Sequence, residues 1–208
     1  MMRMKNFVDL RTKKTSFTIV ESRKIFKALL GAVTHCHERF IIIRNLTMDN
    51  IMIRKQDRNL PKPAGASKKE EDNSEYEVKI ADFAQAVELG YKTPIAEHPL
   101  FDWNQVPYFS PELVLRLPYN QASDIWSLGV LLFAMISGEL PFQVDDYMDR
   151  ALLMEKIKNA QYSFADNPAV WMNTRKEVKD LLAAIFISDP LSRATGAEIR
   201  RNDWCLHG

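Results

Sequence analysis

The fold is decided by residues 123–137, which read SDIWSLGVLLFAMIS. Apolar side chains cover every face of a helix over this stretch, and they do not form a single stripe. A helix that is apolar all round is buried in the middle of a domain. We expect Ser123 to be its N-cap and Gly138 its C-cap. The sequence therefore predicts a domain built around one central helix.

Segments on both sides of this stretch predict further helices. Helical spacing of apolar residues indicates helices over residues 18–39, 151–157 and 178–186, and a last short helix from residue 195 that carries Trp204. The first and last of these open with capping boxes, Thr18–Glu21 and Thr195–Glu198, in which a hydroxyl residue is followed three positions later by an acid.

Three short apolar or alternating runs, residues 40–43, 51–53 and 76–80, are too short for helices and are typical of strands. Residues 55–75 lie between the last two runs and hold many charges and few apolar side chains. Such a segment cannot bury enough apolar surface to order itself, so we predict a disordered insertion. The expected fold class is mainly α with a few short β strands.

Composition indicates which partners and which compartment to expect. Lys and Arg number 28 and Asp and Glu 27, giving a net charge of +1, which does not favour nucleic acid or a membrane surface. The two cysteines, Cys36 and Cys205, exclude a disulfide framework and indicate a reducing compartment. The N-terminus lacks a signal-peptide core, and the longest apolar run is far shorter than the ~20 residues that span a bilayer. We expect an intracellular, cytoplasmic protein.

Five motifs follow one another along the chain. They read IRNLTMDNI (43–51), KIADFA (79–84), PYFSPE (107–112), SDIWSLGV (123–130, followed by GELPF at 138–142) and DPLSRAT (189–195). Protein kinases carry H-R-D-L-x-x-x-N, D-F-G and A-P-E in this order. Over about residues 7–204 the chain resembles the C-terminal lobe of a eukaryotic Ser/Thr protein kinase, similar to the calmodulin-dependent group. The resemblance implies an α+β kinase fold, with ATP and Mg²⁺ as the family's cofactors.

The N-terminal lobe of a kinase has no counterpart among these motifs. That lobe supplies a Gly-rich loop, a strand-borne Lys and a helix Glu, and the 7 glycines of this chain form no G-x-G-x-x-G. We expect one kinase-like domain over residues 1–208, C-lobe only, with the insertion inside it. The surface that an N-lobe would cover should then be exposed, and we expect it to bind a protein partner or a second copy of the chain.

In the catalytic loop, the resemblance implies roles that some residues cannot fill. Asn45 stands in place of the Asp that accepts the proton of the substrate hydroxyl, and a carboxamide cannot take that proton near neutral pH. Thr47 replaces a Lys that steadies the transferred phosphate. Asn50 and Asp82 are retained as the pair that holds Mg²⁺ in the family, although two side chains are too few for an all-protein site.

The residues that organise the kinase fold are retained. By resemblance, Asp124 holds the backbone of the catalytic loop, and Glu112 pairs with Arg193 to tie the activation segment to the last helices. Arg44 corresponds to the Arg that reads a phosphorylated activation segment. Candidate phosphate acceptors in that segment are Tyr91 and Thr93.

Residues implied in catalysis are replaced, whereas residues implied in the fold are retained. This contrast favours a degenerate, pseudokinase-like domain that binds or scaffolds without transferring phosphate. Two alternatives stay open: a fragment or incomplete gene model of an ATP-dependent Ser/Thr protein kinase, and a non-functional truncated product. Sequence upstream of Met1 would separate them, because a Gly-rich loop and a V-A-I-K-like strand there would favour the enzyme.

Overall fold

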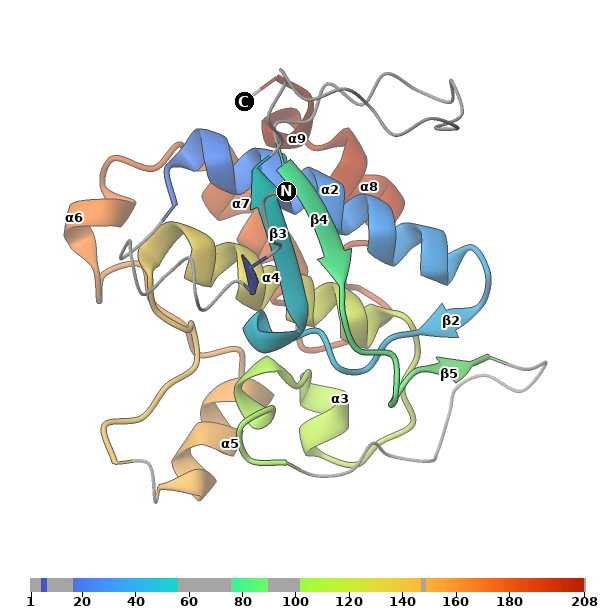
Figure 1. The fold of residues 1–208 in the computed structure, drawn as a ribbon. Helices are drawn as coiled ribbons and strands as arrows, with labels where there is room; N and C mark the ends of the chain where they lie inside the picture. The colour runs from blue at the N-terminus through green and yellow to red at the C-terminus, as the bar shows by residue number, and fades with distance from the viewer. Residues whose placement is uncertain (1–4, 7–16, 56–75, 90–101, 147–148, 208) are drawn as a thin grey trace, which may run out of the picture.

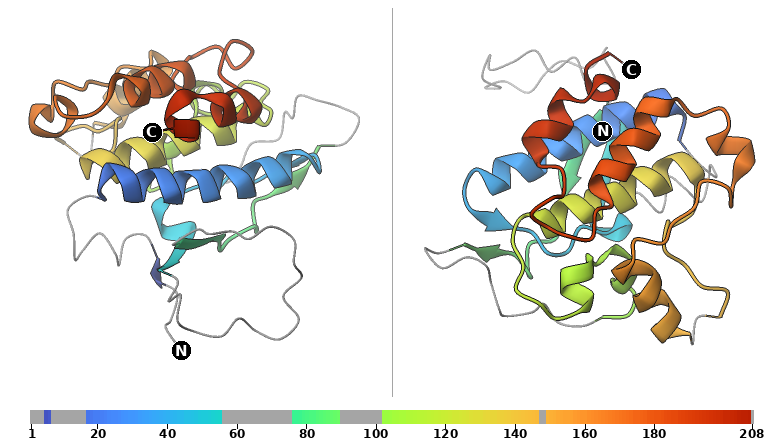
Figure 2. Two further views of the ribbon diagram at one scale, coloured as in Figure 1. Left: turned by 90° about the horizontal axis from the view of Figure 1, so that it is seen from above. Right: turned by 180° about the vertical axis from the view of Figure 1, so that it is seen from behind.

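A computed structural model describes residues 5–6, 17–55, 76–89, 102–146 and 149–207. The helices are α2 (Ile19–His37), α3 (Pro111–Val114), α4 (Ala122–Ser137), α5 (Arg150–Lys158), α6 (Pro168–Trp171), α7 (Lys176–Ile185), α8 (Gly196–Arg201) and α9 (Asp203–His207). The strands are β1 (Lys5–Asn6), β2 (Ile41–Ile42), β3 (Ile51–Lys55), β4 (Tyr76–Ile80) and β5 (Val87–Glu88). Helices α2 and α4 cross the middle of the molecule (Figure 1), with the strands on one side of them and α7, α8 and α9 on the other (Figure 2). The predicted mainly α fold is confirmed.

Helix α4 is the buried centre of the domain, as its sequence predicted. All its residues from Ser123 to Ser137 are buried, and it ends at Gly138, whose φ of 82° is the left-handed conformation that glycine adopts freely. The predicted start is wrong. Gln121 is the N-cap, because Ser123 is already in the first turn and donates its hydroxyl back to the Asn120 carbonyl at 2.9 Å.

Gly129 allows helix α7 to pack closely against helix α4. A Cβ at this position would lie 2.4 Å from Cγ2 of Ile185, which no real contact tolerates. One turn earlier, Trp126 stacks on Phe142 at 5.3 Å and meets the edge of Phe186 at 5.1 Å. Aromatic contacts of this kind add specificity to apolar burial, so they fix how the C-terminal helices sit on the central helix.

Both predicted capping boxes are present, at Thr18 and at Thr195. The predicted last helix, however, is two helices, and Trp204 belongs to the second. Asn202 separates them because its backbone is extended, with a ψ of 138°, and its side-chain oxygen accepts the Trp204 N–H at 3.0 Å. An Asn that caps the following turn ends one helix and starts the next.

The strands form two small antiparallel sheets, β1-β3-β4 and β2-β5. Strands β3 and β4 pair from Ile51 with Ile80 to Lys55 with Tyr76. Lys55, the first residue of the predicted insertion, is therefore part of a strand; the rest of that insertion lies outside the described residues. The 43–50 loop runs from β2 to β3, and residues 81–86 run from β4 to β5, so the two sheets bring these two loops together.

Candidate functional site

Asp124, in the first turn of α4, holds the start of the 43–50 loop. Its Oδ2 accepts the Ile43 N–H at 2.9 Å and its Oδ1 accepts the Arg44 N–H at 2.9 Å. His37, at the end of α2, contacts Oδ2 through Nε2 at 2.8 Å. The sequence offered no signal for His37, because its partner is far along the chain. One buried carboxylate thus joins α2, α4 and the loop.

Asn45 and Asp82 meet across the two loops. Nδ2 of Asn45 donates to Oδ2 of Asp82 at 2.8 Å, and Oδ1 of Asp82 accepts the Ala84 N–H at 2.8 Å. Asn45 is only 4% exposed, and its Oδ1 is buried with no hydrogen-bond partner among the described residues. The carboxamide of Asn45 is thus bound to the carboxylate of Asp82, the two residues that the kinase resemblance assigns to the base position and to the metal motif.

Asn50 and Thr47 make hydrogen bonds within the same loop. Nδ2 of Asn50 donates to the Asn45 carbonyl at 3.1 Å, and the Asn50 carbonyl accepts the Ala81 N–H at 2.8 Å. The Thr47 N–H also donates to the Asn45 carbonyl at 3.1 Å. Thr47 is buried and carries no charge, so it cannot supply the positive group that a Lys would place here.

Arg44 adopts a positive φ of 63° and is bound on both sides. Its Nε donates to the Gln85 carbonyl, and its Nη1 donates to the Tyr119 hydroxyl at 2.9 Å. Sequence reasoning missed both partners. The two candidate phosphate acceptors, Tyr91 and Thr93, lie outside the described residues.

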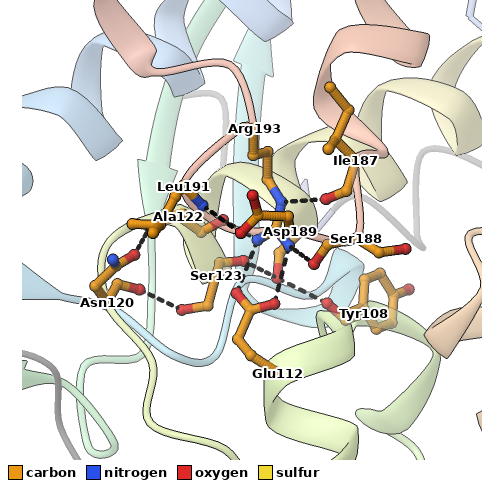
Figure 3. Close-up of polar contacts among 11 residues, drawn as sticks. Tyr108, Glu112, Asn120, Ala122, Ser123, Ile187, Ser188, Asp189, Leu191 and Arg193 are labelled. Atoms are coloured by element: carbon orange, nitrogen blue, oxygen red, sulfur yellow. Dashed lines mark hydrogen bonds and ion pairs between the residues drawn. The ribbon is translucent and has the colours of Figure 1, made fainter.

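Glu112 and Arg193 form a second polar cluster, next to the start of α4 (Figure 3). Arg193 donates through Nη1 and Nη2 to the two carboxylate oxygens of Glu112 at 2.8 and 2.9 Å. Further donations reach the carbonyls of Ala122 at 2.8 Å and Ile187 at 3.0 Å. The guanidinium also lies 5.0 Å from the ring centre of Trp126. A single side chain thus ties α3, the start of α4 and the α7–α8 connection together.

The sequence model of the protein kinase domain matches residues 1–205. The chain belongs to the protein kinase domain family.

Several similar proteins are also named as kinases. Sperm motility kinase 3A of Mus musculus is 30% identical over 189 residues, which are 90% of this chain and 31% of that protein. Serine/threonine-protein kinase PEPKR2 of Arabidopsis thaliana is 29% identical over 199 residues, which are 96% of this chain and 36% of that protein. Sperm motility kinase 2B of Mus musculus is 30% identical, with 90% and 32% covered. The chain spans about a third of the length of these relatives.

The kinase resemblance assigns Mg²⁺ binding to Asn50 and Asp82. Their loops are joined by the Ala81 N–H bond to the Asn50 carbonyl at 2.8 Å, but the groups around Asp82 do not fit the ion. Mg²⁺ demands a nearly octahedral shell of oxygens and water. Both oxygens of Asp82 already accept hydrogen bonds, and one donor is the amino group of Asn45, whose positive end faces the carboxylate. Over the described part of the chain, no group of three or more His, Cys, Asp or Glu side chains could hold a metal ion.

Among the described helices, none is long and apolar enough to cross a membrane.

Proposed function

We propose that this chain is a degenerate, pseudokinase-like kinase domain that binds or scaffolds proteins and does not transfer phosphate. The observation that carries the proposal is the bond from Asn45 to Asp82. A carboxamide has no basic site near neutral pH, and general-base assistance is worth roughly 10²–10⁴ in rate. The amide also binds the carboxylate that a working site needs for its metal.

Thr47 supports the same function. Phosphoryl transfer relies on positioning and on positive charge around the phosphates. A buried, uncharged Thr where the family has a Lys removes one such charge from the loop. A restored carboxylate at position 45 would therefore return the base without returning the charge.

A binding role is supported by the intact framework. Asp124 still holds the loop, and Arg193 still holds Glu112, so the domain can present a stable surface. On that surface Phe83, next to Asp82, is 46% exposed. We place the binding face there, in the part of the domain that an N-lobe covers in kinases, and we propose a protein partner or a second copy of the chain as its occupant.

The proposed compartment is the cytoplasm. Cys36 and Cys205 are both free thiols, as expected in a reducing environment. The balanced charge of the chain, with 28 basic and 27 acidic residues, does not favour nucleic acid or membrane lipids as partners.

The deciding experiment is transfer of radiolabelled phosphate from ATP to a generic basic peptide. It compares the parent chain, Asn45→Asp, Asp82→Ala and the double variant, with an active kinase as positive control. We expect no transfer in any of the four. Transfer by the parent chain would overturn the proposal and favour a Ser/Thr kinase, the activity that the name of PEPKR2 gives. Transfer by Asn45→Asp that disappears in the double variant would also overturn it.

A further inference from the structure

The amide of Asn45 has a second consequence besides the loss of a base. We infer that Asn45 is a positioning residue that holds Asp82 in place of a divalent cation, so that the two loops are locked without metal. The inference rests on the proposed function insofar as residues 43–50 are taken as a degenerate catalytic loop.

The orientation of the amide is determined by its partner. An ionised carboxylate only accepts hydrogen bonds, so Nδ2 of Asn45 must face Oδ2 of Asp82, at 2.8 Å. The amide oxygen is then turned away into the protein, where it is buried and has no partner among the described residues. The domain keeps this unpaired oxygen because a hydrogen bond to a charged acceptor is roughly twice as strong as a neutral one.

The carboxylate of Asp82 is held from two directions. Asn45 donates to one oxygen and the Ala84 N–H donates to the other, both at 2.8 Å. Asn50 supports the backbone of Asn45 from within the same loop, since its Nδ2 donates to the Asn45 carbonyl at 3.1 Å. The carboxylate of Asp82 is therefore held by one donor from each loop, and the backbone of Asn45 is itself supported by Asn50.

An aspartate at position 45 would place a second carboxylate against Asp82. Like charges at this distance repel strongly unless a cation lies between them. The amide of Asn45 replaces this repulsion with attraction, because its amino group provides the positive end of a dipole where a cation would otherwise lie. The parent loop pair should be indifferent to divalent cations, and Asn45→Asp should depend on them.

The test uses the full chain, with Mg²⁺ and Mn²⁺ as probes. Melting temperature is measured in EDTA and in millimolar Mg²⁺, and Mn²⁺ binding is measured by water-proton relaxation. For the parent we expect a change in Tm below about 1 °C, and no Mn²⁺ binding that depends on Asp82. For Asn45→Asp we expect Tm in EDTA to fall by about 3–6 °C, equivalent to the loss of one charge-assisted contact, and to recover in Mg²⁺. Asp49→Asn, which removes an exposed carboxylate from the same loop, is the control and should behave as the parent does.

Two results would overturn the inference. One is Mn²⁺ binding by the parent that is lost in Asp82→Asn. The other is an Asn45→Asp variant that melts at the same temperature with EDTA and with Mg²⁺. If Asn45→Asp fails to fold, Asn45→Ala removes the donor without adding charge and should gain Mn²⁺ binding that Asn45→Ala/Asp82→Asn lacks. Asp82-dependent cation binding by the parent without phosphate transfer would end this inference and leave the proposed function standing, whereas phosphate transfer by the parent would end the proposed function.

Discussion

Arg193 donates two hydrogen bonds to the carboxylate of Glu112, at 2.8 and 2.9 Å, although the two residues are 81 positions apart in the chain. Their side chains are 0% and 2% exposed. A buried ion pair of this kind is weak proof of stability by itself, but removing one partner leaves an uncompensated charge in the interior.

Arg193→Ala should therefore destabilise the domain by roughly 3–5 kcal/mol, measured as the free energy of unfolding in urea. Arg193→Lys keeps the charge and loses the two-point geometry, so it should fall between this variant and the parent. The exposed Arg201→Ala is the matched control and should change stability by less than about 0.5 kcal/mol. An Arg193→Ala protein that melts within a degree of the parent would show that the pair does not hold the fold.

Asp124→Asn should loosen the 43–50 loop. The carboxylate accepts the Ile43 and Arg44 N–H groups on different oxygens, and an amide has only one oxygen to offer. We expect a loss of about 2–3 kcal/mol and faster hydrogen exchange at these two amides. Exchange rates that match those of the parent would contradict the role of Asp124 in holding the loop.

The two thiols should differ in reactivity. Burial raises the pKa of Cys205 to about 11, so almost none of it is thiolate at pH 8 and it should react with a thiol reagent only on unfolding. Burial, and then the nearby charge of Asp124, also raise the pKa of Cys36, but Cys36 is partly exposed. Cys36 should be labelled first, and Cys36→Ser should remove that early phase. Fast labelling of Cys205 in the native protein would contradict its burial.

The capping box at Thr195 should weaken in acid. Hydrogen bonds from the Thr195 N–H, and then from its hydroxyl, lower the pKa of Glu198 below its ordinary 4.5. A carboxyl with a lowered pKa in the folded state contributes stability above its unfolded pKa, and that contribution is lost as pH falls through the folded value. The difference in urea midpoint between the parent and Glu198→Ala should be constant near neutral pH and shrink below about 4.5. A difference that grows in acid would contradict this sign.

Self-association tests the proposed binding face. Without a partner, the half-exposed Phe83 of the 81–86 loop should promote weak self-association as concentration rises, measured by light scattering, and should bind an apolar dye. Phe83→Ser should reduce both, whereas Met172→Ser, at an exposed residue of the α6 C-cap, should not. A parent chain that stays monomeric and binds no dye would speak against this face.

Local patterns were sufficient for most of the secondary structure. The capping boxes at Thr18 and Thr195 involve groups three residues apart, and the all-round apolar surface of α4 can only be satisfied by burial. The order of the five motifs was sufficient for the family, because each motif is a contiguous stretch. The start of α4 and the break at Asn202 were missed because the exact ends of a helix depend on the hydrogen bonds of a few backbone groups. The spacing of apolar residues does not show these bonds.

The contacts that make the site depend on how distant segments pack. His37 meets Asp124 over 87 positions and Arg44 meets Tyr119 over 75, and no local pattern links these pairs. The sequence showed a carboxamide at position 45, where the kinase resemblance implies the catalytic base. Only the tertiary structure decided that this amide would donate to Asp82, because the two residues are 37 positions apart and their loops are brought together by the two sheets.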